Sequence, residues 1–578
     1  GIYLQREWAG KILRDSEQEK WLDLADGFFR QGDFQAMRAC AREILEREPA
    51  DLDGRALLAQ ASFYLGDETA ARELAGEVQA EDSRHLRALL VEGELYAGDF
   101  LLVQEIAVLE RLTALAGELP ADVLRGCDYL VWVRALCLLA DAYELAGKPK
   151  KAAEAMFEIS RLVTEPLSKA DFYSKGLFLT NYRVMPVDRS LALHKGYNAF
   201  FRAKVTFPHE PAQAKRHLRI GYISPDFRLH AVVYFLLPFL RDYNKKEFEV
   251  FVYQRGKSDS VTQRLKRFAV CWRDVAELSP QEAARQIYAD KIDILVDLSG
   301  HTQDSCLPVL ACRPAPVQVS GIGYMNTTGL REVDYFLSDV HCQPAAEPTR
   351  GFTEKVVRLP KSHLCYGPEA IRSMPEPGRE APCLQNGYVT FGCFNTFSKV
   401  SRQTLLLWRA ILEQVPTARL VLKAKTCSIP AGQQYIRERL AALSIDAARV
   451  ELRPYSPDYL EQYRDIDVAL DTLPYNGGLT TCEALYMGVP VVTLRGRSHG
   501  SRFGASLLEN AGVAELIAES EMEYVKKAVQ LATSPEILQQ FHAGLREELL
   551  RSPLMDGRRY MQDIEAAYRK MWQAAVQK

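Results

Sequence analysis

The chain of 578 residues has neither a recognisable signal peptide nor an apolar run long enough to cross a bilayer. It also has no strong excess of charge, because 75 acidic residues nearly balance 72 basic ones. That balance argues against a dedicated nucleic-acid-binding protein. We therefore expect a cytoplasmic protein without a nucleic-acid or membrane partner. The chain begins at Gly1 and not at methionine, so we expect it to be trimmed.

Motifs that mark several enzyme classes are missing as well. The sequence contains no G-x-x-x-x-G-K-[ST] phosphate loop, no kinase motif set and no G-x-S-x-G nucleophile elbow. Its twelve cysteines are scattered through apolar runs and never form a C-x-x-C pair. Reduced core cysteines are the expected interpretation, and structural zinc is the less favoured one. With 47% hydrophobic residues the chain can bury several cores, roughly three or four domains of about 150 residues.

The first part of the chain, to about residue 167, shows almost only helical patterns and a weak repeat. An aromatic residue precedes a glycine by two to four positions at four places, and the first three glycines are 34 and 32 residues apart. This pattern resembles the tetratricopeptide repeat, a helix–turn–helix unit in which the glycine ends the first helix. Stacked repeats usually present a concave surface to a peptide or protein, although an array that only supports an enzyme or mediates dimerisation fits too. The repeat glycines are Gly32, Gly66, Gly98 and Gly147.

From residue 217 onward the pattern changes to strands that alternate with helices. The predicted strands form two series separated by segment 367–387, which is rich in proline, glycine and glutamate and is typical of an interdomain link. We therefore predict two doubly wound α/β domains with a cleft between them, and a last helix, 556–576, that crosses back to the first domain. The first series is 218–224, 248–254, 292–298, 317–322 and 335–338, and the second is 389–393, 419–423, 450–452, 468–470 and 491–494.

Segment 467–494 carries the clearest sign of chemistry. A short apolar strand ends at Asp471, a turn rich in proline, asparagine and glycine follows, and Thr480 and Thr481 open an amphipathic helix. The free N–H groups and the positive dipole end of such a helix bind anions, and the two hydroxyls can add donors. This turn can therefore hold the diphosphate of a nucleotide.

Two further residues follow strands and can reach the same cleft. Lys399 lies in the same half as the turn and can neutralise a phosphate, although alone it would be read as a solvated surface lysine. His230 can act as an acid, a base or a donor near neutral pH, or be only a helix-start histidine. The pair Asp465 and Asp467 has the D-x-D spacing of metal-dependent sugar transferases. It precedes a strand and lacks supporting ligands, so we expect no metal there.

These motifs together resemble the O-GlcNAc transferase/SPINDLY family, glycosyltransferase family 41. The segments occur in the order seen in that family, and the likeness covers about residues 217–578. A repeat-rich front is typical of the family too, and the chain looks like a bacterial member. The segments are RIGYISPDFRLH, ACRPAPVQVSGIGYMNTTG, FGCFNTFSK, DVALDTLPYNGGLTTCEALYMGVPVVTL and SRFGASLL.

The resemblance implies a GT-B fold and metal-independent, inverting transfer of a sugar from a UDP-sugar to Ser or Thr of an acceptor protein. GlcNAc is the first choice of sugar, flagellin is the acceptor that bacterial relatives of this layout suggest, and a homo-oligomer is an option. The implied regions are a repeat region at 1–167, a helical linker at 168–216, an N-terminal Rossmann-like catalytic domain at 217–385, a C-terminal nucleotide-sugar-binding domain at 386–555, and a helix at 556–578 that packs back on the catalytic core.

The resemblance also assigns site residues. Lys399 matches the lysine that contacts the donor diphosphate and stabilises the leaving UDP, and His230 matches the histidine at the sugar end of the site. Glu483 falls where the family has an aspartate that bonds the ribose hydroxyls, and Tyr459 falls near the residue that stacks on uracil. The other expected donor contacts are Tyr324, Asn395, Thr396, Asn476, Gly477, Gly478, Leu479, Thr480 and Thr481.

Several of these positions depart from the family pattern. Gly478 stands where the family's N-x-H-T-T turn usually has histidine, and Leu479 replaces its first threonine. A glycine cannot replace an imidazole donor, so the sugar stays open. The alternatives are another nucleotide sugar, such as GDP-fucose or a UDP-hexose, and an asparagine acceptor. A non-catalytic repeat scaffold and a small-molecule glycosyltransferase remain further alternatives.

Overall fold

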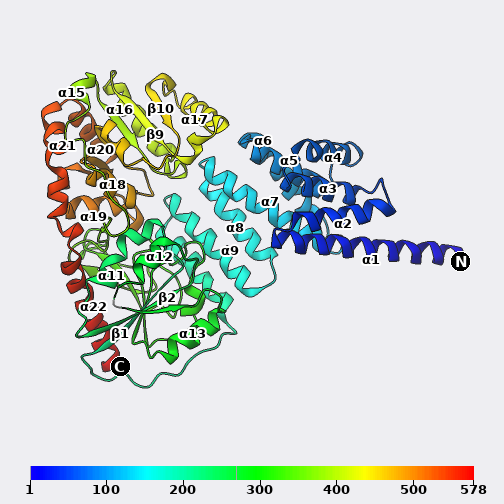
Figure 1. Cartoon of the computed structure of the whole chain (residues 1–578), viewed down its shortest axis with the longest axis horizontal. Coiled ribbons are helices and arrows are strands. Elements are labelled where there is room, and N and C mark those ends of the chain that lie inside the picture. Colours follow the sequence, from blue (N-terminus) through cyan, green and yellow to red (C-terminus); the bar gives the residue numbers. More distant parts are fainter. Residues whose placement is uncertain (1, 269) are drawn as a thin grey trace. The chain divides into compact units, whose positions relative to one another are not determined.

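The structure is a computed structural model of the whole chain, and it describes residues 2–268 and 270–578. The chain forms two compact units, residues 1–164 and residues 165–578 (Figure 1). Within the described residues, no helix combines the length and the apolar character that a membrane span requires.

The first unit, drawn in blue to cyan in Figure 1, is an array of helices in which each helix packs on the next along the chain. Such pairs of consecutive helices joined by tight turns are the expected units of a tetratricopeptide-like repeat. The helices are α1 (Ile2–Gln31), α2 (Phe34–Arg47), α3 (Leu52–Tyr64), α4 (Glu68–Glu81), α5 (Leu86–Gly98), α6 (Leu102–Glu118), α7 (Gly126–Leu145) and α8 (Pro149–Leu162).

The predicted repeat glycines end the first helix of three pairs. Gly32, Gly66 and Gly147 have φ angles of +72°, +88° and +70°, a left-handed conformation that glycine adopts without strain. Gly98 also ends its helix, but without the left-handed conformation. Gly98 is the last residue of α5, and Phe100, two residues later, takes the left-handed position with φ of +54°.

The second unit contains two sheets, and all neighbouring strands in both sheets are parallel. The first sheet has the order β3-β2-β1-β4-β5-β6-β7, and the second has the order β10-β9-β8-β11-β12-β13. In both, the order reverses next to the first strand, as in doubly wound sheets, so ligands are expected at the carboxyl ends there. The strands are β1 (Leu218–Ser224), β2 (Phe248–Gln254), β3 (Cys271–Asp274), β4 (Ile294–Asp297), β5 (Val317–Ser320), β6 (Tyr335–Asp339), β7 (Lys355–Leu359), β8 (Thr390–Cys393), β9 (Arg419–Lys423), β10 (Val450–Arg453), β11 (Val468–Leu470), β12 (Val491–Leu494) and β13 (Ile517–Ala518).

Helices connect these strands and cover the sheets. Two of them, α9 and α10, precede the first strand and belong to this second unit. The helices are α9 (Pro166–Leu179), α10 (Val187–Lys195), α11 (Leu237–Arg241), α12 (Ser260–Leu265), α13 (Pro280–Ala289), α14 (Leu307–Leu310), α15 (Cys383–Asn386), α16 (Arg402–Gln414), α17 (Pro430–Ala442), α18 (Leu479–Tyr486), α19 (Phe503–Asn510), α20 (Glu521–Ala532), α21 (Pro535–Leu550) and α22 (Gly557–Gln577).

All ten strands predicted from the sequence are present, and three more were missed. The missed strands β3, β7 and β13 lie at sheet edges. β3 and most of β7 are partly exposed, and β13 is only two residues long. An edge strand of this kind lacks the continuous apolar run by which a buried parallel strand is recognised.

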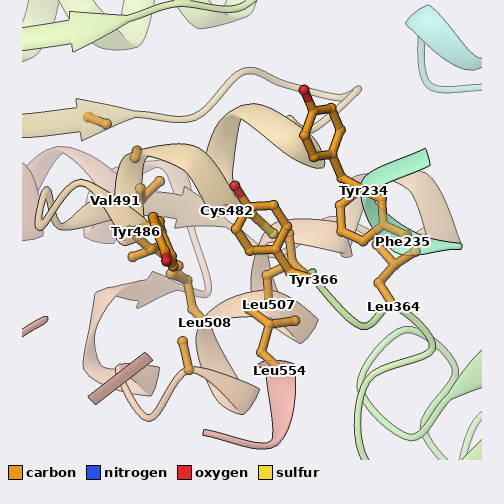
Figure 2. Close-up of a cluster of buried hydrophobic side chains, with 14 of the residues drawn as sticks. Tyr234, Phe235, Leu364, Tyr366, Cys482, Tyr486, Val491, Leu507, Leu508 and Leu554 are labelled. Carbon is orange, nitrogen blue, oxygen red and sulfur yellow. The ribbon is translucent and has the colours of Figure 1, made fainter. Parts of the chain in front are cut away.

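The two α/β halves share one apolar core, to which the last helix also contributes. Figure 2 shows part of it, where Tyr234 and Phe235 of the first half lie near Cys482 of α18. The helix α22 packs against the first sheet, and the hydroxyl groups of Tyr568 and Tyr222 lie 2.9 Å apart. The end of the second unit is therefore built into the first α/β half.

Candidate active site

A buried aspartate shapes the turn that follows β11. Asp471 is 2% exposed, and its carboxylate accepts hydrogen bonds from the Gly477 N–H at 2.9 Å and from the Thr493 hydroxyl at 2.7 Å. Burial raises the pKa of Asp471 to about 6, although these donors favour its charged form. By holding residue 477 close to the end of β11, Asp471 places the start of α18 beyond the carboxyl edge of the second sheet.

The two glycines of the turn have different surroundings. A Cβ atom on Gly477 would lie 2.3 Å from the Thr480 hydroxyl oxygen and 3.1 Å from the Asn395 side-chain amide, so only glycine fits there. The Thr480 hydroxyl donates to the Asn395 Oδ1 atom at 2.6 Å and ties this turn to the loop after β8. A Cβ atom on Gly478 would meet nothing within 4 Å. The turn is therefore closed at residue 477 and open at residue 478.

The open side of the turn coincides with the positive end of α18. The first N–H groups of a helix have no acceptor within the helix, and those of Leu479, Thr480 and Thr481 have no backbone acceptor elsewhere in the described chain. The Thr481 hydroxyl donates to the Gly477 carbonyl at 3.1 Å, and the Thr480 hydroxyl is bonded to Asn395. The donors on offer to an anion here are therefore backbone N–H groups.

Lys399 lies at the same edge of the sheet, in the short helix η4 (Phe397–Lys399) after β8. It is half-buried, and its Nζ atom is 4.2 Å from the centre of the Tyr475 ring in the turn. Burial lowers the pKa of Lys399 to about 8, and the carboxylate of Asp471 opposes that shift only in part. The ammonium is thus held charged at neutral pH in a place where its charge is poorly solvated, which favours an anionic ligand.

A second group of predicted residues lies further along α18. Glu483 is 3% exposed, and its carboxylate accepts a hydrogen bond from the Tyr459 hydroxyl. Burial raises the pKa of Glu483 to about 7, against the effects of Tyr459 and of Arg372. The Arg372 guanidinium lies 5.3 Å from the centre of the Tyr459 ring and donates to its hydroxyl at 3.3 Å. The structure thus brings the expected uracil-stacking and ribose-binding residues into direct contact.

His230 caps the short helix η3 (Ala231–Phe235) after β1, and its capping hydrogen bond defines the tautomer of the imidazole ring. The Nδ1 atom accepts the backbone N–H of Val232 at 3.2 Å. A backbone N–H can only donate, so the proton of a neutral ring sits on Nε2. Burial lowers the pKa of His230, although the Asp226 carboxylate, 3.9 Å from Nδ1, opposes this. At neutral pH His230 therefore presents an N–H donor.

The hydroxyl group of Tyr324 has partners within the protein. It is 2% exposed, and its hydroxyl lies 2.8 Å from His194 Nε2 in α10 and accepts from the Asn181 amide at 2.9 Å. These contacts tie α10 and the short helix η1 (Thr180–Tyr182) to the loop after β5. The side chain is thus occupied within the protein, and only the loop that carries it remains for a donor sugar.

Three further predicted contacts have separate environments. Asn476 is fully buried, and its side chain bonds the Thr472 carbonyl at 2.8 Å and the Gly504 N–H at 3.2 Å, so it supports the turn from within. Leu479 is half-buried and packs against the core. Thr396 is exposed next to Lys399 and is the one of the three whose side chain faces solvent.

The turn and His230 come from different halves of the unit, yet the structure places their elements in contact. The helix η3, which His230 caps, packs against α18. The contact between η3 and α18 therefore brings the element that carries the histidine N–H onto the helix at whose N-terminal turn the lysine ammonium lies. This set of donors can hold a diphosphate and stabilise negative charge that grows on it.

A separate cavity of about 250 Å³ opens near the carboxyl ends of β2 and β4 in the first half. None of the expected donor contacts lines it. Its lining residues are Leu167, Asp171, Tyr197, Arg255, Pro280, Asp304, Ser305 and Pro308.

Comparison with known proteins identifies the class that this fold and site define. The chain matches Glycosyl transferase family 41 over residues 186–368 and 364–564 and belongs to that family. Its two Rossmann-type halves form the GT-B fold. The chain superposes with a TM-score of 0.73 on a solved structure that shares 31% sequence identity with it, a lysine-to-methionine mutant of Thermobaculum terrenum O-GlcNAc transferase. That match covers 92% of this chain and 99% of the other. The resemblance and the fold class predicted from the sequence are confirmed.

Among curated proteins, the chain is similar to probable UDP-N-acetylglucosamine–peptide N-acetylglucosaminyltransferases. It is 40% identical over 395 residues to SPINDLY of Petunia hybrida, and the aligned residues make up 66% of this chain and 41% of the relative. It is 30% identical over 367 residues to SEC of Arabidopsis thaliana, which covers 62% of this chain and 37% of the relative. The chain spans about two fifths of the length of these relatives.

Sequence reasoning missed two residues that shape the site. Asp471 was noted only as the end of a strand, and its role in folding the turn depends on bonds to residues that lie up to 22 positions away. Arg372 lies in the segment expected to be an interdomain link, and no motif surrounds it. The segment contains a second arginine, Arg379, so the charge of Arg372 alone did not single it out.

Proposed function

We propose that this chain is an inverting, metal-independent protein O-glycosyltransferase. It transfers a sugar, with GlcNAc as the first choice, from a UDP-sugar to a Ser or Thr hydroxyl of an acceptor protein. The observation that carries the proposal is the convergence of Lys399 and the N-terminus of α18 on one turn, in a chain of glycosyltransferase family 41. A lysine and free backbone N–H groups supply the charge that a leaving nucleoside diphosphate requires.

The D-x-D pair supports the metal-independent part of the proposal. Asp467 is buried, and its two carboxylate oxygens accept the backbone N–H groups of Cys383 at 2.9 Å and Thr390 at 2.8 Å. The carboxylate of Asp465 pairs with Arg453 at 2.8 Å. The Asp467 carboxylate is therefore committed to the fold and that of Asp465 is engaged in an ion pair at the surface, so we assign the electrostatic work to Lys399 and the helix end.

In the proposed reaction the acceptor hydroxyl oxygen attacks the anomeric carbon from the face opposite the diphosphate. The bond between that carbon and the diphosphate oxygen breaks, and the electron pair stays on the diphosphate beside Lys399. The hydroxyl proton goes to a phosphate oxygen of the donor. We assign to His230 the role of a hydrogen-bond donor, because Val232 occupies its Nδ1 atom and Nε2 carries the ring proton.

The first unit supplies acceptor recognition in this proposal. An array of helix pairs usually holds a peptide or protein, and a small acceptor would not need it. This argues against a small-molecule glycosyltransferase. Flagellin is the acceptor that we propose to test first, on the ground of the resemblance to bacterial members. The relatives in Petunia and Arabidopsis carry names for peptide N-acetylglucosaminyltransferases, which supports the peptide acceptor and the sugar.

One observation favours a second candidate within the same class. The open space beside Gly478 lies where the family usually has a histidine side chain, so the sugar pocket can accept a different hexose or deoxyhexose. A UDP-hexose or GDP-fucose donor is therefore the alternative to UDP-GlcNAc, and asparagine is the alternative acceptor.

The test is a panel of nucleotide sugars offered to the purified chain together with flagellin. Nucleotide release and the intact mass of flagellin are followed for the wild type and for Lys399→Met. A gain of one hexosamine that depends on Lys399 supports the main proposal, and a gain of a hexose or deoxyhexose supports the alternative donor. Fragmentation locates the sugar on Ser, Thr or Asn. Donor binding without nucleotide release or mass gain, on flagellin and on a peptide library, would support a non-catalytic scaffold instead.

A further inference from the structure

Three side chains that suit a transition metal meet at the junction of the two α/β halves. Cys342 follows β6 and His363 follows β7 in the first half, whereas His499 begins the short helix η8 (His499–Ser501) in the second half. One ligand atom from each lies within 4.8 Å of the other two. The exposed fraction is 0% for Cys342, 1% for His363 and 3% for His499. None of them belongs to the donor turn, so the cluster is separate from the proposed chemistry.

The hydrogen bonds around the cluster engage the Nδ1 atoms of both histidines. The His363 Nδ1 atom lies 2.6 Å from the Asp339 carboxylate, and the His499 Nδ1 atom lies 3.0 Å from the Ser338 hydroxyl. The buried Nε2 atom of His363 has no hydrogen-bond partner among the described residues. A buried polar atom without a partner is costly, and metal-bound histidines commonly place their other nitrogen on a carboxylate in this way.

We propose that Cys342, His363 and His499 bind a zinc ion that fastens the two α/β halves together. A thiolate and two imidazoles suit zinc better than magnesium or calcium, which prefer oxygen ligands. Binding converts the Cys342 thiol into a thiolate and releases its proton to solvent, while both imidazoles bind in their neutral form. The fourth position falls to a water or to the Arg502 carbonyl oxygen, which already lies 3.6 Å from the Cys342 sulfur.

Zinc binding requires the three ligand atoms to move slightly closer together. Zinc binds sulfur at about 2.3 Å and nitrogen at about 2.0–2.1 Å, so the ligand atoms of a tetrahedral site lie roughly 3.5 Å apart. The three ligand atoms already lie within 4.8 Å of one another, so the proposed site requires small shifts that keep the Asp339 and Ser338 contacts of the two histidines. Because the ligands come from both halves, the ion would resist any motion that separates them.

The first experiment measures zinc in the full chain after equilibration with zinc alone and removal of free metal. We expect one zinc per chain in the wild type, and with cobalt in place of zinc a charge-transfer band that reports a thiolate ligand. Cys342→Ala and His499→Gln should lose both signals. The matched controls Cys427→Ala and His542→Gln alter a buried cysteine and a buried histidine elsewhere in the unit and should keep them. A wild type without bound zinc, or a Cys342→Ala variant that binds as much, overturns the proposal.

A second experiment does not depend on removing a ligand, and it keeps the test valid if those variants fold poorly. Ser338→Ala deletes only the hydroxyl that orients His499 and should weaken zinc binding about 10-fold. The Tm of the wild type should rise with zinc concentration, and the rise should need more zinc in Ser338→Ala. If the Tm of the wild type does not respond to zinc, or if both proteins respond at the same concentration, the site is not a zinc site.

Discussion

Replacing Lys399 by methionine should separate turnover from stability. Methionine keeps the length and the apolar stem of lysine and removes only the ammonium. In the folded protein the pKa of Lys399 falls from 10.5 to about 8, which corresponds to a free-energy penalty on its charged form of about 3 kcal/mol. A bound diphosphate relieves this penalty, and an empty site does not. The ammonium thus lowers the stability of the free protein while it prepares the site for its ligand.

The magnitude follows from that arrangement. Loss of one well-placed charged donor to the leaving group typically lowers kcat by about 10²–10³-fold. We therefore expect Lys399→Met to lose about that factor in kcat, while its free energy of unfolding at pH 7 stays level or rises by at most about 3 kcal/mol. Turnover is measured as UDP released with acceptor present, and stability is measured by urea unfolding.

A matched control lies in the same half of the unit. The Nζ atom of Lys425 stands 5.9 Å from the Tyr455 ring centre, so it also faces a tyrosine, but it is exposed and distant in sequence from the turn. Lys425→Met should change neither kcat nor stability appreciably. The reasoning is wrong if Lys399→Met turns over at a near-normal rate, or if its loss of turnover merely follows a loss of folded protein.

Three further outcomes are expected. Gly477→Ala should lower the Tm and weaken donor binding, because its Cβ atom would lie 2.3 Å from the Thr480 hydroxyl oxygen. The control Gly478→Ala should fold normally, and equal Tm values for the two variants would contradict this prediction. Glu483 has a pKa of about 7, raised from 4.5, so between those values the folded state holds more protons than the unfolded state and stability falls as pH rises. Donor affinity should rise as pH rises through about 7, and Glu483→Gln should remove both trends in unfolding and binding titrations. His230→Ala should lose about 10–100-fold in turnover, and His230→Gln should lose less because glutamine keeps an N–H donor. Equal losses in the two variants, or a wild-type rate that follows deprotonation of the histidine, would show that His230 is a base instead.

The sequence revealed the parts of the fold whose signal is local. The run 467–494 carries its own strand, turn and helix, so these elements could be predicted without knowledge of any neighbour. The same holds for Lys399, because the buried strand that precedes it could be recognised from the sequence. Gly32, Gly66 and Gly147 could be placed for the same reason, since a left-handed turn requires glycine.

What could not be predicted depends on contacts between distant segments. Arg372 acts through Tyr459, which lies 87 positions further along the chain. The tautomer of His230 depends on one backbone hydrogen bond, which no sequence pattern reports. The contact of the Tyr324 hydroxyl with His194 joins residues 130 positions apart, and no local pattern reports it.

The position of α22 has a consequence for how the protein folds during synthesis. Tyr568 completes the core beside Tyr222, although 346 positions separate the two residues. A ribosome that adds about 5–20 residues per second needs at least tens of seconds to span that distance. Throughout that time β5, β7 and α11 lack the apolar contacts that α22 makes with them. The growing chain therefore needs protection from aggregation until residues 557–577 emerge, and a truncation before them should yield insoluble protein.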